Sequence, residues 1–98
     1  MFLAVLTYRA DLSEVDELKP THLEYVQQQV DAGYYLLCGR KNPRTGGVIL
    51  ADGLDREKLA RILDDDPFVR GGVAEYEITE FVPTRASEAV VATLGLTL

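Results

Sequence analysis

Apolar runs and amphipathic stretches alternate along this 98-residue chain in an order that few folds share. Residues 2–8, 34–38, 48–51 and 73–82 are apolar or alternate with polar residues, as strands do. Residues 18–31 and 55–64 place apolar side chains three or four positions apart, as amphipathic helices do. The predicted order is strand, helix, strand, strand, helix, strand.

This order predicts an α+β fold of the ferredoxin-like βαββαβ type, with two helices on one face of a four-stranded antiparallel sheet. A chain of this length forms one small domain, and no third layer remains to cover the other face. A second copy is the simplest cover, so we expect a homodimer. Residues 1–83 form the predicted domain. Residues 84–98 are a C-terminal tail or a dimer arm, and the sequence does not decide between them.

Local signals predict where the two helices begin and end. Asp55 is a suitable N-cap, and the run of aspartates before Pro67 ends the second helix. Asp11, Ser13 and Asp16 are possible starts of the first helix. Pro20 fits only a first turn, so the firm part of this helix is expected to begin near Lys19. Gly33 is expected to end it.

Composition excludes several classes of function. The net charge of −6 repels nucleic acid and anionic membranes, so neither is an expected partner. The single cysteine, Cys38, allows no internal disulfide and no Cys-rich metal site, and it suits the cytoplasm. No apolar run reaches membrane-spanning length, and the N-terminal run lacks the positive charge of a signal peptide.

His22, the only histidine, falls on the apolar face of the first predicted helix. A buried imidazole needs a hydrogen-bond partner, and Asp66 is the best placed one. It continues the apolar stripe of the second helix, which is expected to lie beside the first. Asp66 followed by Pro67 also suits an N-cap, and one carboxylate is able to serve both purposes.

A histidine held by a carboxylate suits general acid–base chemistry, because the second ring nitrogen is left to exchange protons. The alternative is that His22 and Asp66 only lock the two helices together. Cys38 lies in an apolar strand without an evident base, so we predict no nucleophile. Metal binding is not expected either, because a single histidine offers one good ligand.

A basic cluster of Arg40, Lys41 and Arg44 lies between the second and third predicted strands. Such a group focuses a small anionic ligand toward a cleft, although a solvated hairpin loop explains the same residues. Tyr25, one turn beyond His22, is a further candidate to line a pocket. Arg40, Arg44 and Tyr25 are therefore predicted to bind substrate.

Three segments together resemble the YCII-related domain family: residues 20–22 (Pro-Thr-His), residues 38–39 (Cys-Gly) and residues 66–73, which begin with Asp-Pro. The resemblance covers about residues 1–83 and implies a dimeric α+β barrel. It places the family's active-site histidine and aspartate on His22 and Asp66. Gly39, in the second of these segments, is a further residue that we predict to bind substrate. Arg40 stands where many members have proline.

We therefore predict a cofactor-independent, homodimeric enzyme of the isomerase or lyase type. It would use the His22–Asp66 pair on a small anionic or cyclic organic compound. The alternative is a non-catalytic metabolite-binding or accessory homodimeric module.

Overall fold

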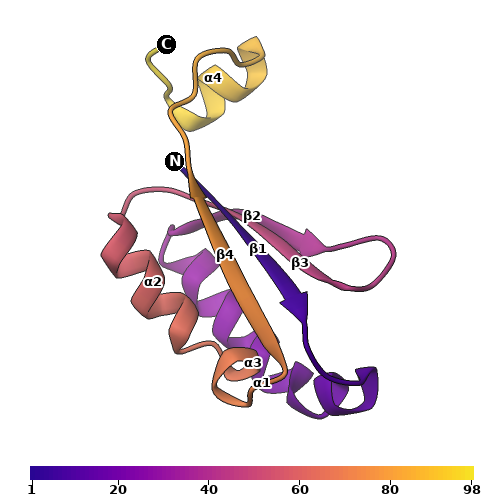
Figure 1. Ribbon diagram of the computed structural model, residues 1–98. Helices are drawn as coiled ribbons and strands as arrows, with labels where there is room; N and C mark the ends of the chain where they lie inside the picture. The colour runs from indigo at the N-terminus through magenta and orange to yellow at the C-terminus, as the bar shows by residue number, and fades with distance from the viewer.

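The computed structural model describes all 98 residues and shows a four-stranded sheet with helices on one face (Figure 1). The elements are β1 (Phe2–Tyr8), α1 (Leu12–Asp31), β2 (Tyr35–Arg40), β3 (Gly46–Ala51), α2 (Arg56–Asp64), α3 (Pro67–Arg70), β4 (Ala74–Glu80) and α4 (Glu88–Leu94). The spatial order of the strands is β2-β3-β1-β4, and every neighbouring pair is antiparallel. The predicted α+β ferredoxin-like fold is confirmed. No helix combines the length and the apolar character that crossing a membrane requires.

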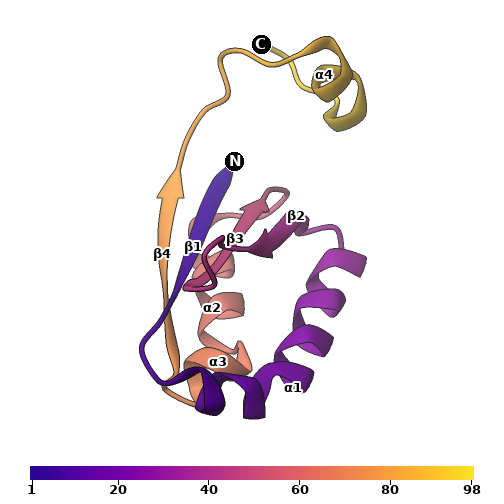
Figure 2. The ribbon, with the colours of Figure 1, turned by 90° about the vertical axis from the view of Figure 1, so that its right-hand side faces the viewer.

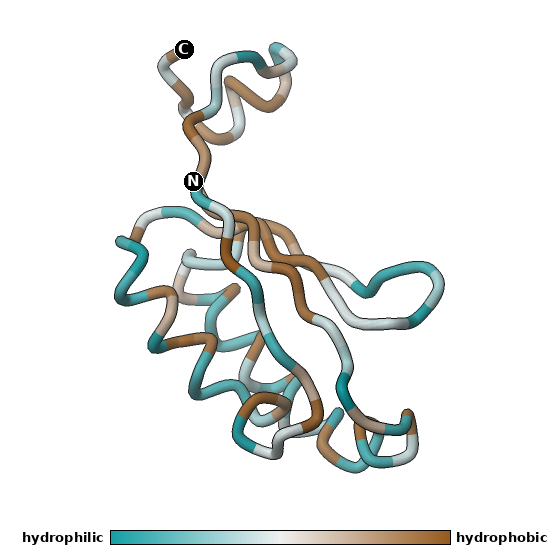
Figure 3. The backbone as a smooth tube through the Cα atoms, viewed as in Figure 1, coloured by the Kyte–Doolittle hydropathy of each residue, from teal (hydrophilic) through white to brown (hydrophobic).

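The core lies between the sheet and the helices, because alternate residues of each strand point to that side. In β1, Phe2, Ala4 and Leu6 are buried. Leu59 and Leu63 of α2 pack against the first two of them in one apolar cluster. Figure 3 shows hydrophobic residues gathered along β1 and β3, whereas β4 and the β2–β3 hairpin loop are largely hydrophilic.

The opposite face of the sheet also carries apolar side chains. The antiparallel register aligns Leu3 and Val5 of β1 with Leu50 and Val48 of β3. Leu37 of β2 pairs with Leu50 and is 69% exposed. Packing of this face against a second copy remains a prediction.

Helix α1 begins at Leu12 with Asp11 at the N-cap position, which is one of the possible starts that the sequence indicated. The expectation that the firm part begins only near Lys19 was wrong. Pro20 lies inside the helix, where it removes one backbone hydrogen bond at a cost of about 3 kcal/mol. Packing of the first two turns offsets this cost. Val15 is completely buried in a second apolar cluster together with Leu6 and Phe68, and Leu18 packs against this cluster.

Residues 81–98 extend away from the domain, as Figure 2 shows, and α4 stands apart from the sheet and from the other helices. The Ser87 hydroxyl accepts a hydrogen bond from the Val90 amide, and Gly95 ends the helix in the left-handed conformation. No residue of α4 is buried. The two predicted alternatives for residues 84–98, a C-terminal tail or a dimer arm, both stay predictions.

Candidate functional site

Asp66 lies where α2 ends and α3 begins, and it is the one charged residue that is completely buried. Its carboxylate Oδ1 accepts a hydrogen bond from the Phe68 backbone amide at 2.9 Å. Pro67 occupies the first position of α3, which needs no amide hydrogen. The predicted N-cap is confirmed.

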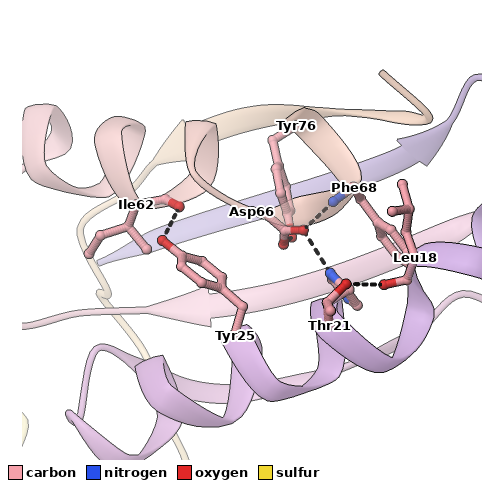
Figure 4. A network of polar contacts seen from close by, with 8 residues as sticks. Leu18, Thr21, Tyr25, Ile62, Asp66, Phe68 and Tyr76 are labelled. Carbon is pink, nitrogen blue, oxygen red and sulfur yellow. Dashed lines mark hydrogen bonds and ion pairs between the residues drawn. The ribbon is translucent and has the colours of Figure 1, made fainter. Parts of the chain in front are cut away.

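Two side chains from other elements complete the surroundings of this carboxylate (Figure 4). His22 Nδ1 of α1 lies 2.8 Å from Asp66 Oδ1, and the Tyr76 hydroxyl of β4 donates to Oδ2 at 2.8 Å. Burial raises the pKa of Tyr76 above its ordinary value, and the nearby charge of Asp66 raises it further. Tyr76 therefore remains a neutral donor. Three donors offset the cost of burying the Asp66 charge.

The imidazole of His22 is held on one face as well as at one edge. It stacks on the Phe68 ring with 3.8 Å between centroids and 9° between planes. The His22 side chain is 12% exposed. When Nδ1 donates its proton to Asp66, the neutral ring carries its lone pair on Nε2. The ring is thus fixed with one nitrogen left for other chemistry.

A pocket of about 340 Å³ lies between α1 and the β2–β3 hairpin, and His22 lines it. Arg40, Arg44 and Gly39 line it too, so the structure brings these four predicted site residues together. Phe68 forms part of its apolar wall.

Tyr25 does not line this pocket, contrary to the prediction from its place on α1. Its hydroxyl donates to the Ile62 backbone carbonyl at 2.6 Å, so it ties α1 to α2 (Figure 4). Burial raises the pKa of Tyr25, which keeps this donor neutral. Leu23, the residue after His22 on α1, lines the pocket and is 52% exposed.

Arg44 is already engaged within the protein. Its guanidinium forms an ion pair with Asp16 of α1 and lies 5.9 Å from the centroid of the Tyr8 ring. The hydrogen bond from Arg44 holds the pKa of the Asp16 carboxyl below its usual range. This pair connects the hairpin loop to the beginning of α1.

Cys38 also lines the pocket, on the strand that pairs with β3. Burial raises the pKa of its thiol, which disfavours the reactive thiolate. The thiol of Cys38 is therefore not an activated nucleophile. No group of three or more His, Cys, Asp or Glu side chains is placed to hold a metal ion.

Sequence reasoning missed Tyr76, Phe68 and Lys19, all of which line the pocket. The alternation of β4 was a usable signal for Tyr76, because Ala74, Tyr76 and Ile78 share the face that packs on the helices. Lys19 lies one turn before His22, so the two share one side of α1.

The fold and the site define a ferredoxin-like α+β domain in which a histidine–aspartate contact borders a pocket. The family model of the YCII-related domain matches residues 1–82. The chain belongs to the YCII-related domain family.

Among curated proteins, no sequence matches this chain. Its structure is similar to that of 5-chloro-2-hydroxyhydroquinone dehydrochlorinase from Burkholderia phenoliruptrix, solved in complex with 2,5-dihydroxybenzoquinone. The TM-score is 0.67 at 13% sequence identity, over 84% of this chain and 94% of that chain. This likeness supports the fold.

Proposed function

We propose that this protein is an enzyme that transfers a proton on a small cyclic or anionic organic compound. His22 acts as the general base and acid, and Asp66 orients it. The observation that carries this proposal is the contact of a completely buried carboxylate with a histidine whose ring borders a pocket. A purely structural histidine would satisfy its ring without facing a space large enough for a ligand.

The geometry supports a specific sequence of proton and electron movements. A ligand C–H bond next to a carbonyl group, placed at His22 Nε2, loses its proton to that nitrogen. The electron pair of this bond moves toward the carbonyl oxygen and forms an enolate. Asp66 stabilises the imidazolium that results, through the Nδ1 hydrogen bond.

The enolate then has two outcomes. Return of the proton to a different carbon completes an isomerisation. Departure of a leaving group with its electron pair from the adjacent carbon completes an elimination, and neither route needs a cofactor. A dehydrochlorinase is an elimination enzyme, so the structural neighbour supports this class of reaction by analogy of fold.

The proposed enzyme is a homodimer that acts in the cytoplasm. The exposed apolar side chains of Leu37 and Val48 on the open sheet face favour pairing with a second copy. The single free cysteine favours a reducing compartment.

Deuterium exchange tests the proposal without knowledge of the natural substrate. The probe is 2,5-dihydroxybenzoquinone, in which each ring C–H carbon lies between a carbonyl carbon and an enol carbon. Addition of a deuteron to that carbon, with loss of the enol O–H proton, gives a CHD group between two carbonyl groups. Removal of the original proton from this group by His22 regenerates the enol and completes the exchange. In D₂O, the protein should accelerate the loss of the ring proton signal by about a hundredfold, the lower end for general acid–base catalysis. His22→Gln should abolish this acceleration, because glutamine is able to contact Asp66 but not to abstract a proton.

The matched control is Tyr25→Phe, which lies on the same helix outside the pocket and should keep the full rate. Equal rates of deuterium exchange with the wild-type protein and with His22→Gln would overturn the proposed enzymatic activity. Binding of the probe without exchange supports the non-catalytic binding module instead. Circular dichroism would establish whether each variant is folded. Asp66→Asn is a second variant, and it should slow the exchange.

A further inference from the structure

The pocket beside His22 is lined by cations and by no carboxylate. The chain carries 16 acidic residues and a net charge of −6, yet the charged residues of this lining are Lys19, Arg40 and Arg44. An acidic protein that gathers cations around one pocket creates a local positive potential there. Such a potential favours an anionic ligand.

The three cations are not equivalent. Arg44 forms an ion pair with Asp16 and lies over the Tyr8 ring, so its charge is used inside the protein. Lys19 and Arg40 have no carboxylate within the 4.0 Å that defines an ion pair. These two charges therefore remain for a ligand.

Lys19 and Arg40 approach the pocket from different elements. Lys19 belongs to α1, three residues before His22, and Arg40 is the last residue of β2. Both residues are exposed, so they lie where the pocket opens to solvent. A helix and a strand thus each contribute one unpaired cation to the opening of a pocket whose wall holds His22.

The interior of the pocket suits an apolar ring. Phe68, Val26 and Ile49 contribute apolar walls, and the volume is about 340 Å³. An apolar cavity of roughly 150 Å³ is able to hold benzene. The pocket therefore has room for one ring with its substituents.

We propose that Lys19 and Arg40 form an anion subsite, and that the ligand is a single ring carrying a carboxylate. The planar guanidinium of Arg40 matches a carboxylate with two parallel hydrogen bonds, and Lys19 adds a second charge. The ring then extends into the apolar pocket toward His22. This inference rests on the proposed function, because it names the class of compound that the same pocket binds.

Two probes of nearly the same shape test the subsite. Benzoate is charged and benzamide is neutral, and their binding is followed by NMR titration of the wild-type protein. Benzoate should bind about tenfold more tightly, as expected for a charge-assisted contact. The preference should shrink as salt is added, because salt screens exposed charges.

Lys19→Gln combined with Arg40→Gln should abolish the preference for benzoate and leave benzamide binding unchanged. The matched control is Lys41→Gln, which removes the neighbouring charge outside the pocket. The Lys41 ammonium donates to the Thr7 hydroxyl at 3.2 Å, and this variant should keep the preference.

Equal affinity for the two probes in wild-type protein overturns the subsite, and so does a preference that survives the double substitution. The absence of any shift with both probes overturns it as well. In each of these cases, the His22-dependent deuterium exchange described above shows separately whether the proposed function stands.

Discussion

Tyr76 and Asp66 lie ten residues apart on different elements, and a 2.8 Å hydrogen bond joins the phenol of one to the carboxylate of the other. This contact occupies Oδ2, while Oδ1 accepts from Phe68 and contacts His22 Nδ1. Both oxygens of a completely buried carboxylate are thus satisfied. The orientation of the His22 ring depends on this whole arrangement.

Replacement of Asp66 by asparagine should change the state of His22 and the stability of the fold. The side-chain amide of asparagine puts an NH2 donor in place of one carboxylate oxygen, so at least one of the three hydrogen bonds to this side chain is lost. We expect a loss of about 2–4 kcal/mol in the free energy of unfolding, measured with urea. The ¹⁵N signals of the ring should move from the Nδ1–H toward the Nε2–H tautomer.

Asp65→Asn is the matched control for that substitution. Asp65 is adjacent in sequence, but its side chain is 57% exposed and pairs with Arg70 at the surface. It should change neither the ring signals nor the stability appreciably. An Asp66→Asn protein with unchanged ring signals would contradict the orienting role.

The hydroxyl of Tyr76 should stabilise the fold more than that of Tyr35. Tyr76→Phe leaves Asp66 Oδ2 without a partner in a buried place, which costs about 1–3 kcal/mol. The Tyr35 hydroxyl is buried without a protein hydrogen-bond partner, so Tyr35→Phe should be neutral or stabilising. Urea denaturation at neutral pH compares the two variants. An equal loss of stability in both would contradict a stabilising hydrogen bond from Tyr76 to Asp66.

Tyr76 should also make the stability of the fold depend on pH in the alkaline range. Burial raises the pKa of Tyr76 in the folded state above the ordinary value near 10 that the unfolded chain keeps. The folded state therefore holds its proton longer, and the resulting stability is fully present below about pH 10 and declines as the pH rises. Tyr76→Phe should flatten this decline, so the curves of wild type and variant converge above pH 10. Parallel curves would argue against a buried, neutral phenol.

Gly46 should be intolerant of any side chain. Its φ of +155° lies outside the range that side chains prefer, and a Cβ there would lie 1.8 Å from the Leu6 carbonyl oxygen. Because this neighbour is backbone of the inner strand β1, Gly46→Ala should cost about 3 kcal/mol or more. Gly39→Ala is the control, since a Cβ there meets nothing within 4 Å. Similar melting temperatures for the two variants would exclude this close approach.

The thiol of Cys38 should react slowly with iodoacetamide at neutral pH. Burial raises its pKa, so the thiolate fraction is smaller than that of a free thiol such as N-acetylcysteine. The rate should increase with pH beyond the range in which the free thiol has reached its plateau. Mass spectrometry follows the modification, and Cys38→Ser corrects for reaction at other residues. A rate equal to that of the free thiol would contradict the raised pKa of the Cys38 thiol.

Periodicity and helix-capping signals were sufficient for most of the fold. Each strand was predicted from its own residues, and the Asp55 and Asp66 caps were predicted because a cap involves a carboxylate and an amide two or three residues later. The contact between His22 and Asp66 followed from two apolar stripes and the helix packing of the motif. Local sequence thus determined the helices and strands, their order, and the pairing of His22 with Asp66 in the site.

Only the tertiary structure decided the rest of the site. Tyr76 reaches Asp66 because the register of β4 against β1 places it there, and no local pattern encodes that distance. Arg44 is paired with Asp16 because α1 begins before Pro20, which packing of Val15 made possible. A contact between distant segments depends on how layers pack and on which partner is nearest. These are properties of the assembled fold rather than of any one segment.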